Sequence, residues 1–269
     1  MNPLPYTATE LMTVAAARLL RNDDVCFVGI GLPSAACNLA RLTSAPGITL
    51  IYESGTIATR PSVLPLSIGD GELCETALTT VSVPEIFRYW LQGGRITVGF
   101  LGAAQIDRFA NLNTTVIGSY ARPSVRLPGG GGAPEIATSC GQVFIVMPQT
   151  RRTFVERLDF VTSLGHGQGG GDRARLGITT KGPTKVITDL CVMEPVDATM
   201  EMVVTQMHPS VTRQQVSDAT GWPVVFAAHV EQTAQPSALE LDALRELHRR
   251  TAVARAAADI GASAVVAQA

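Results

Sequence analysis

The spacing of apolar residues at the start of the chain predicts a helix followed by a strand–helix–strand unit. Thr7 and Glu10 have the spacing of a capping box, and the Ala, Leu and Met residues behind them indicate a helix to about residue 20. Val25–Val28 is a strand-length apolar run, the loop behind it leads into a helix to about Leu42, and a second apolar run ends at Tyr52. Strands that alternate with helices in this way favour a parallel sheet.

Further strand-length runs and one more amphipathic helix follow along the chain. A helix is predicted over 84–91, and strands over 96–101, 142–147 and 185–188. The segments between them are rich in turn residues and are predicted as loops, among them 61–70 and 173–182. Ser237 and Glu240 repeat the capping-box spacing and open a helix over about 237–256, with a weakly patterned tail behind it. Because no linker interrupts the pattern, the sequence predicts one α/β domain over 1–269, with an open, mainly parallel sheet flanked by helices.

Composition narrows the class of protein. Apolar residues make up 46% and charged residues 16% of the 269, which excludes a disordered chain and favours a large subunit interface. The net charge is −2 and no basic stripe stands out, which argues against a nucleic-acid partner. The longest apolar runs are far shorter than the roughly 20 residues that span a bilayer, and the first residues lack the pattern of a signal peptide. We therefore expect a cytoplasmic protein without a membrane segment.

Five cysteines are scattered along the chain without metal-ligand spacing: Cys26, Cys37, Cys74, Cys140 and Cys191. Their odd number and irregular spacing predict buried free thiols in a reducing compartment rather than a disulfide framework. A zinc site is not supported by this pattern.

Glu53 is the first candidate for chemistry, because it stands directly behind the apolar run that ends at Tyr52. Parallel sheets gather their chemistry at the carboxyl ends of their strands. A carboxylate there can be held rigidly and partly desolvated, which suits a nucleophile or a general base. The same sequence is also expected where a strand simply ends and a charged residue reaches water. A catalytic role for Glu53 therefore needs evidence from other segments.

Two glycine-rich segments are candidate binding loops. Gly29 and Gly31 follow a strand, but position 34 is Ser and Pro33 lacks an N–H where a dinucleotide site needs one, so a tight turn is favoured over a cofactor site. Four successive glycines occupy 129–132. The backbone N–H groups of such a run can hold an oxyanion or a phosphate, and a flexible connection explains it as well.

Polar residues in two further loops leave their role open. His166 begins a glycine-rich loop over 166–172, which we interpret as a mobile cover, and the histidine itself as an incidental surface residue. Gln105, Asn111 and Asn113 follow the strand over 96–101, with Asp107 between them. These amides would fix neighbouring loops or a ligand, or make local turn hydrogen bonds.

Taken in order, six segments resemble the B (β) subunits of family I CoA-transferases, among them those that act on glutaconate and on 3-oxoadipate. They are 28–33 (VGIGLP), 52–55 (YESG), 102–107 (GAAQID), 111–113 (NLN), 129–133 (GGGGA) and 173–177 (RARLG). The likeness covers about residues 7–247. Any single motif would be weak evidence for the family, but several motifs in the same order make the resemblance specific. It implies a fold of the NagB/RpiA/CoA-transferase type.

The resemblance also implies roles for individual residues. Glu53 would be the covalent nucleophile, and Gly131, Gly132 and Ala133 would bind the CoA thioester and its oxyanion. Substrate or loop positioning would fall to Ser54, Gly55, Gln105, Asn111 and Asn113. Coenzyme A is then substrate and covalent intermediate, with no bound cofactor and no metal.

The expected reaction is a ping-pong transfer of CoA through a glutamyl-CoA thioester on Glu53. Succinyl-CoA is the favoured donor and 3-oxoadipate the favoured acceptor, because segment 64–72 is similar to the 3-oxoadipate group; glutaconate with acetyl-CoA comes second. The alternatives are a hydrolase of CoA thioesters or of a CoA-linked ring, and a non-catalytic effector-binding module. The resemblance further implies an A (α) subunit that completes the site, in an α2β2 assembly.

Overall fold

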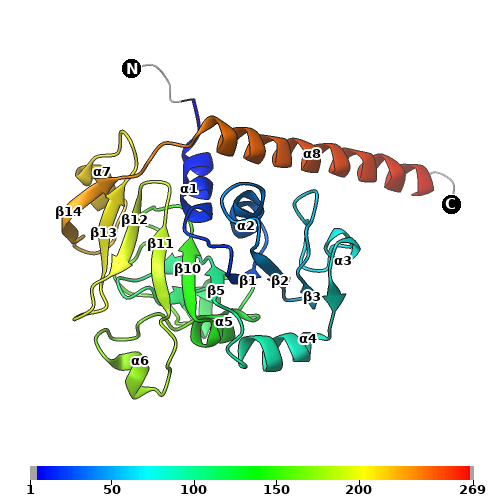
Figure 1. Cartoon of the computed structure of the whole chain (residues 1–269). Helices are drawn as coiled ribbons and strands as arrows, with labels where there is room; N and C mark the ends of the chain where they lie inside the picture. Colours follow the sequence, from blue (N-terminus) through cyan, green and yellow to red (C-terminus); the bar gives the residue numbers. More distant parts are fainter. Residues whose placement is uncertain (1–4, 267–269) are drawn as a thin grey trace.

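A ten-stranded sheet forms the centre of the computed structural model, which describes residues 5–266, with side chains as far as residue 257 (Figure 1). Across the sheet the strands lie in the order β14 (Phe226–Gln232), β13 (Met202–Met207), β12 (Cys191–Pro195), β11 (Pro183–Ile187), β10 (Gln142–Val146), β5 (Val98–Leu101), β1 (Val25–Val28), β2 (Thr49–Tyr52), β3 (Thr56–Ile57) and β4 (Thr79–Thr80). The five strands from β11 to β2 are parallel, and antiparallel strands flank them on both sides. This confirms the predicted α/β class and its mainly parallel sheet.

Alternate residues of the central strands face two separate cores. Cys26 and Val28 of β1 belong to one core, which packs under α1 (Ala8–Ala17), α2 (Leu32–Leu42) and α8 (Ala238–Val266). Phe27, between them, belongs to the other core, together with residues of α5 (Ala133–Ser139) and of the π-helix η1 (Ile86–Leu91). Figure 1 shows α8 along the top of the molecule and α4 and α5 at the bottom. Burial on both faces explains why these strands are almost continuously apolar.

Two capping boxes join the first and last helices. Glu10 caps α1 through Thr7, and its carboxylate also accepts from Arg245 of α8 at 2.7 Å. Glu240 caps α8 in the same way and pairs with Arg18, at the end of α1, at 2.7 Å. The hydrogen bond from Arg245 lowers the pKa of Glu10 to about 2. Burial alone would raise the pKa of Glu240, but the bonds from Arg18 and Ser237 outweigh it and lower that pKa to about 2. Arg18 at the end of α1 therefore binds the capping glutamate of α8, and Arg245 of α8 binds the capping glutamate of α1.

Several elements differ from the sequence prediction. Helix α5 lies in a connection that the sequence predicts as irregular, α6 (Asp172–Arg175) interrupts the loop over 173–182, and α8 continues to Val266 instead of ending near residue 256. The strands β12, β13 and β14 and the helix α7 (Arg213–Asp218) have no counterpart in the sequence prediction. Residues 267–269 of the predicted tail lie outside the described residues.

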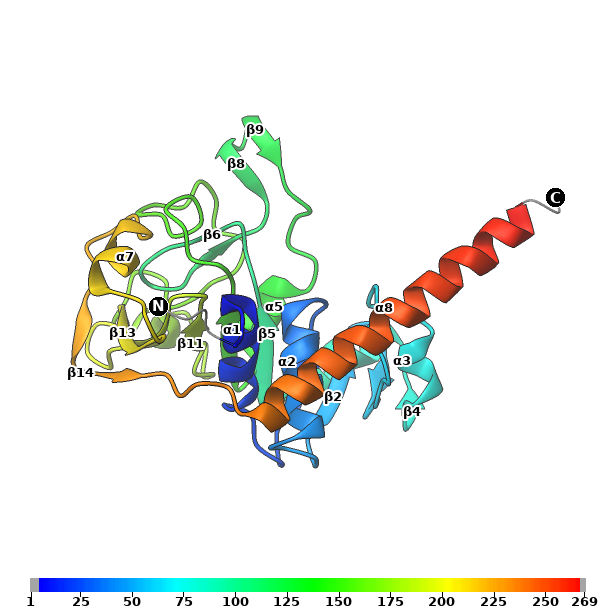
Figure 2. The ribbon, with the colours of Figure 1, turned by 90° about the horizontal axis from the view of Figure 1, so that it is seen from above.

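The remaining elements are short or lie at the edges. Helix α3 (Glu72–Glu75) follows β3, and helix α4 (Val83–Glu85) follows β4. Two hairpins stand apart from the main sheet: β6 (Gln105–Ile106) with β7 (Leu112–Asn113), and β8 (Val116–Ser119) with β9 (Arg122–Arg126). Figure 2 shows the β8–β9 hairpin and the far end of α8 extending beyond the body of the molecule.

Burial of the free cysteines is confirmed for four of the five. Cys26, Cys37, Cys140 and Cys191 are buried, whereas Cys74 is exposed on α3, contrary to the prediction. No helix among the described residues has the length and apolar content needed to cross a membrane.

Candidate active site

Glu53 follows β2 at the carboxyl end of the parallel strands, as its sequence position predicts. The turn behind it closes with a hydrogen bond from the N–H of Gly55 to the carbonyl of Tyr52 at 3.0 Å. Gly55 has φ +111°, and a Cβ atom there would lie 1.9 Å from the carbonyl oxygen of Val81. The N–H of Val81 in turn donates to the carbonyl of Gly55 at 2.9 Å. Only glycine fits this turn, which ties Glu53 to the segment that leads into α4.

Gly132 brings the glycine loop against the Glu53 carboxylate. A Cβ atom on Gly132 would lie 3.0 Å from Oε1 of Glu53 and 2.7 Å from Cζ of Phe87. The φ angle of Gly132 is −81°, which any residue adopts, so close approach and not backbone conformation requires glycine here. The structure therefore places two predicted site residues, 79 positions apart in sequence, side by side.

The glycine loop presents backbone N–H groups beside this carboxylate. The N–H of Gly129 donates to the carbonyl of Thr114 at 2.8 Å, and the N–H of Ala133 donates to the carbonyl of Gly130 at 2.9 Å. Within residues 5–266, the N–H groups of Gly130, Gly131 and Gly132 have no such acceptor. Gly131 and Gly132 thus offer donors of the kind an oxyanion needs, whereas the Ala133 N–H is engaged in the loop's own turn.

The predicted amides lie in a buried network behind the loop. Oδ1 of Asn111 accepts from the N–H groups of Gly165 at 2.8 Å and Gly167 at 3.1 Å. Asn113 donates to Oε1 of Gln105 at 2.7 Å. Asn111 also donates to Asp107, a carboxyl whose pKa is raised by burial. The side-chain amides of Asn111 and Asn113 are thus bonded to other loop residues, which agrees with a role in positioning the loops.

Thr114 links the amides to the glycine loop. It follows Asn113 at the end of β7, and its Oγ1 donates to the carbonyl of Gly129 at 2.8 Å. Its own N–H donates to Oγ1 of Thr162 at 2.9 Å. The start of the glycine loop is therefore fixed by side chains and is not a free connection.

Ser54 lies inside the turn next to the nucleophile candidate. Its hydroxyl oxygen is buried, and no hydrogen-bond partner reaches it among the described residues. The same holds for Oγ1 of Thr56, two positions on. Two unsatisfied hydroxyls beside Glu53 form an exception to the rule that buried polar groups are bonded.

His166 is buried, so its interpretation as a surface residue is wrong. The residue is 2% exposed, and Nε2 donates to the carbonyl of Pro183 at 2.7 Å, which requires the proton on that nitrogen. Burial lowers the pKa of this imidazole. The contact joins the 166–172 loop to β11, and sequence spacing gives no sign of it.

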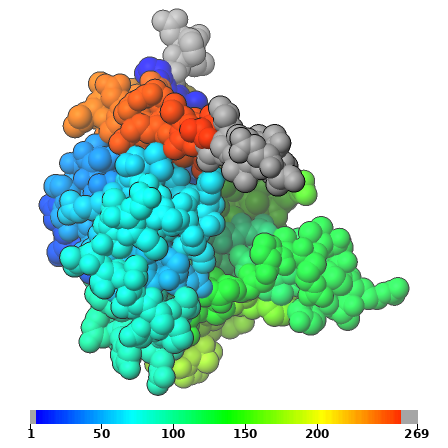
Figure 3. Space-filling view, turned by 90° about the vertical axis from the view of Figure 1, so that its right-hand side faces the viewer, coloured from blue at the N-terminus to red at the C-terminus, as the bar shows by residue number. Residues whose placement is uncertain are grey.

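Phe87 is the site residue that the sequence does not indicate. It lies in η1, is half-buried, and presents its ring to Gly132. A second aromatic ring, that of Phe27, meets it edge-on at 6.0 Å. Figure 3 shows the cyan region around residues 60–90 and the green region around 115–135 on two sides of a hollow in the surface. The sequence predicts a helix over 84–91, but the spacing of apolar residues does not show that the part containing Phe87 is a π-helix.

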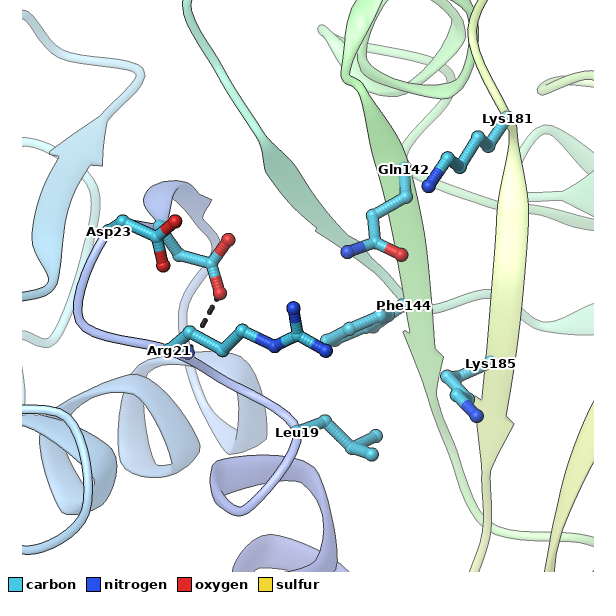
Figure 4. A pocket seen from close by; sticks show the side chains of 8 residues that line it. Leu19, Arg21, Asp23, Gln142, Phe144, Lys181 and Lys185 are labelled. Carbon is cyan, nitrogen blue, oxygen red and sulfur yellow. Dashed lines mark hydrogen bonds between the residues drawn. The ribbon is translucent and has the colours of Figure 1, made fainter.

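A separate cavity of about 320 Å³ lies at the opposite, amino-terminal ends of the parallel strands (Figure 4). Arg21, Lys181 and Lys185 line it together with Asp23 and the ring of Phe144. The Lys185 ammonium is paired with a carboxylate of β12 at 2.5 Å, so part of the positive charge is already neutralised. This cavity contains none of the predicted site residues.

Comparison with known proteins identifies the class to which this fold and site belong. The family model for coenzyme A transferase matches residues 9–219, and the chain belongs to that family. Among the described residues, no group of three or more His, Cys, Asp or Glu side chains could hold a metal ion.

Within the family, the relatives that match over nearly the full length include two B subunits. The chain is 64% identical to the B subunit of 3-oxoadipate CoA-transferase from Pseudomonas knackmussii, over 93% of this chain and 96% of that protein. It is 34% identical to the B subunit of glutaconate CoA-transferase from Acidaminococcus fermentans, over 88% and 91%. The crystal structure of glutaconate coenzyme A-transferase from that organism superposes with a TM-score of 0.84 at 30% identity, over 90% and 94%.

Proposed function

We propose that this chain is the B subunit of a CoA-transferase that moves CoA from succinyl-CoA to 3-oxoadipate. The assignment of the acid rests on the 64% identity to the B subunit of a 3-oxoadipate CoA-transferase over almost the whole of both chains. The observation that carries the chemistry is the contact between the Glu53 carboxylate and Gly132 of the glycine loop.

In the first half-reaction, a carboxylate oxygen of Glu53 attacks the thioester carbon of the donor. The C–S bond breaks, which gives a mixed anhydride and CoA thiolate. The thiolate then attacks the glutamyl carbonyl, which forms the Glu53–CoA thioester and releases the donor acid. The acceptor carboxylate repeats both steps in reverse, so that Glu53 is regenerated and the acceptor carries CoA.

Each step passes through a tetrahedral oxyanion that needs hydrogen-bond donors. The N–H groups of Gly131 and Gly132 are proposed to supply them, and one well-placed donor of this kind lowers the barrier by roughly 3–4 kcal/mol. Glu53 is rigidly placed because the Gly55 turn is tied to Val81. No proton transfer is required, since nucleophile, leaving group and acceptor are all anions.

We further propose that an A subunit completes the site, in an α2β2 assembly. The two relatives described above, which act on 3-oxoadipate and on glutaconate, are by name the B subunits of their enzymes. Large exposed apolar side chains of this chain would be covered by such a partner, for example Leu66 and Leu78, which are 62% and 79% exposed.

The test is the intact mass of the complex, co-expressed with its A subunit, after brief incubation with succinyl-CoA alone. A CoA-sized adduct on this chain that is absent in Glu53→Gln supports the covalent mechanism, because glutamine keeps the shape and removes the nucleophile. Donor consumption without an adduct would exclude it. Glutaconate and 3-oxoadipate, offered in turn as acceptors, then distinguish the two acids by kcat/KM.

Hydrolysis is the second candidate, because a relative named as a hydrolase matches most of the chain. The chain is 28% identical over 250 residues to the cholesterol ring-cleaving hydrolase IpdB subunit from Mycobacterium tuberculosis. In this case water replaces the acceptor acid, so donor loss continues without any acceptor. Strict dependence on the acceptor would eliminate hydrolysis as the main reaction.

A further inference from the structure

Three segments that are distant in sequence meet around the Glu53 carboxylate. One is the turn that carries Glu53, the second is the glycine loop, and the third runs from β4 through α4 into η1. The third segment touches both of the others: Val81 is bonded to Gly55, and the ring of Phe87 lies against Gly132. It therefore bridges the nucleophile and the predicted oxyanion donors.

The Phe87 ring forms an apolar wall at this junction. Its Cζ would lie 2.7 Å, and its Cε1 3.1 Å, from a Cβ on Gly132, the same position that is 3.0 Å from Oε1 of Glu53. The edge-on contact with Phe27 backs the ring from the core side. An apolar group that fills the space next to a carboxylate removes a place where water would otherwise stand.

The wall is held firmly at both ends of its segment. Upstream, Ser82 and Glu85 form a capping box, with the Ser82 N–H donating to Glu85 at 2.8 Å. Ile86, directly before Phe87, and Leu91, four residues after it, are fully buried in the second core. Phe87 lies between these two residues, is half-buried, and has the tip of its ring against Gly132, next to Glu53.

We propose that Phe87 is a positioning residue that keeps water from the Glu53–CoA thioester and thereby sets the ratio of transfer to hydrolysis. The inference rests on the proposed thioester mechanism. The competing step is attack of a water oxygen on the glutamyl carbonyl: the C–S bond breaks, CoA leaves as thiolate, the two protons of the water pass to solvent and thiolate, and the Glu53 carboxylate is regenerated. A transferase must suppress this step during the interval between release of the first acid and arrival of the second.

The experiment compares Phe87→Ala and Phe87→Leu in the complex with the A subunit. Alanine opens the space, whereas leucine retains most of the apolar cover and guards against a folding defect in the first variant. Tyr89→Ala is the matched control, because it removes a ring from the same π-helix at a side chain that is 60% exposed. Three quantities are measured: transfer with acceptor, donor hydrolysis without acceptor, and the lifetime of the CoA adduct by intact mass.

We expect Phe87→Ala to raise the ratio of hydrolysis to transfer by about tenfold or more and to shorten the adduct's lifetime in proportion. Phe87→Leu should lie between this variant and the wild type, and Tyr89→Ala should keep the wild-type ratio. Equal losses of transfer and hydrolysis in both Phe87 variants, with an unchanged adduct lifetime, would refute the inference. If the wild type itself forms no adduct, the proposed mechanism fails, and that outcome is visible before any variant is compared.

Discussion

Substitution of Gly132 by alanine tests the geometry of the site most directly. The new methyl group would lie 2.7 Å from Phe87 and 3.0 Å from Glu53, whereas carbon atoms in contact are separated by about 3.5–4.0 Å. Either the loop or the Glu53 and Phe87 side chains must therefore shift by about 1 Å, and a displacement of this size between reacting groups can lower the rate about 100-fold. Because the φ angle of −81° suits alanine, the loss of stability should be confined to overpacking, about 1–3 kcal/mol.

Gly129→Ala is the matched comparison, because it has the opposite properties and its N–H is already bonded to Thr114. The φ angle of Gly129 is +102°, which costs a non-glycine residue about 1–3 kcal/mol, but no atom lies within 4 Å of the added methyl group. The two variants should thus lose similar stability, while only Gly132→Ala loses most of its kcat. Steady-state transfer by the A–B complex and thermal unfolding of each variant measure the two effects. Full activity in Gly132→Ala, or a larger loss in Gly129→Ala, would show that the Glu53–Gly132 contact does not govern the reaction.

Two further predictions concern stability. Gly55→Ala should cost about 3 kcal/mol or more, because the methyl group would lie 1.9 Å from the Val81 carbonyl oxygen at φ +111°, and urea unfolding that matches the wild type would contradict this. Glu10→Gln should lower the unfolding free energy at pH 7 by on the order of 1–2 kcal/mol, since its partner Arg245 is half-exposed and screened. The folded pKa of about 2 lies below the ordinary 4.5, so this contribution is present above pH 4.5 and is lost as the pH falls toward 2. Urea titrations at pH 7 and about pH 3 should show the difference between variant and wild type shrinking, and a constant difference would exclude the linkage.

Local pattern is sufficient to predict the core of the fold. The capping boxes at Thr7 and Ser237 and the apolar runs of β1 and β2 each specify an element by short-range rules, and the structure confirms them. Helix α5 is hidden in the sequence because it begins directly behind four glycines, which carry no helical periodicity. The later strands are longer than β1 and β2, but polar residues interrupt their apolar runs, as Gln206 does in β13 and His229 and Glu231 do in β14. Helix α7 is short and mostly polar, with one buried residue.

The site is only partly predictable, for a physical reason. Glu53 and the glycine loop can be named from their motifs, but their contact joins residues 79 positions apart, and no local rule encodes such a contact. Phe87 cannot be named at all, since a half-buried aromatic residue in a helix is ordinarily core. Likewise, the partner of the His166 ring is the carbonyl of Pro183, which lies 17 residues later in sequence, and no local rule indicates this contact.

The two ion pairs that join the caps of α1 and α8 have a consequence for the order in which the protein folds during synthesis. Glu10 pairs with Arg245 across 235 residues, and Leu241 packs with Tyr6 and Leu11 at the other end of the chain. During synthesis, α2 can cover most of the apolar face of α1 early, because the two helices share one core. Tyr6 and Leu11 remain exposed until the start of α8 has left the ribosome, so this small cluster closes last.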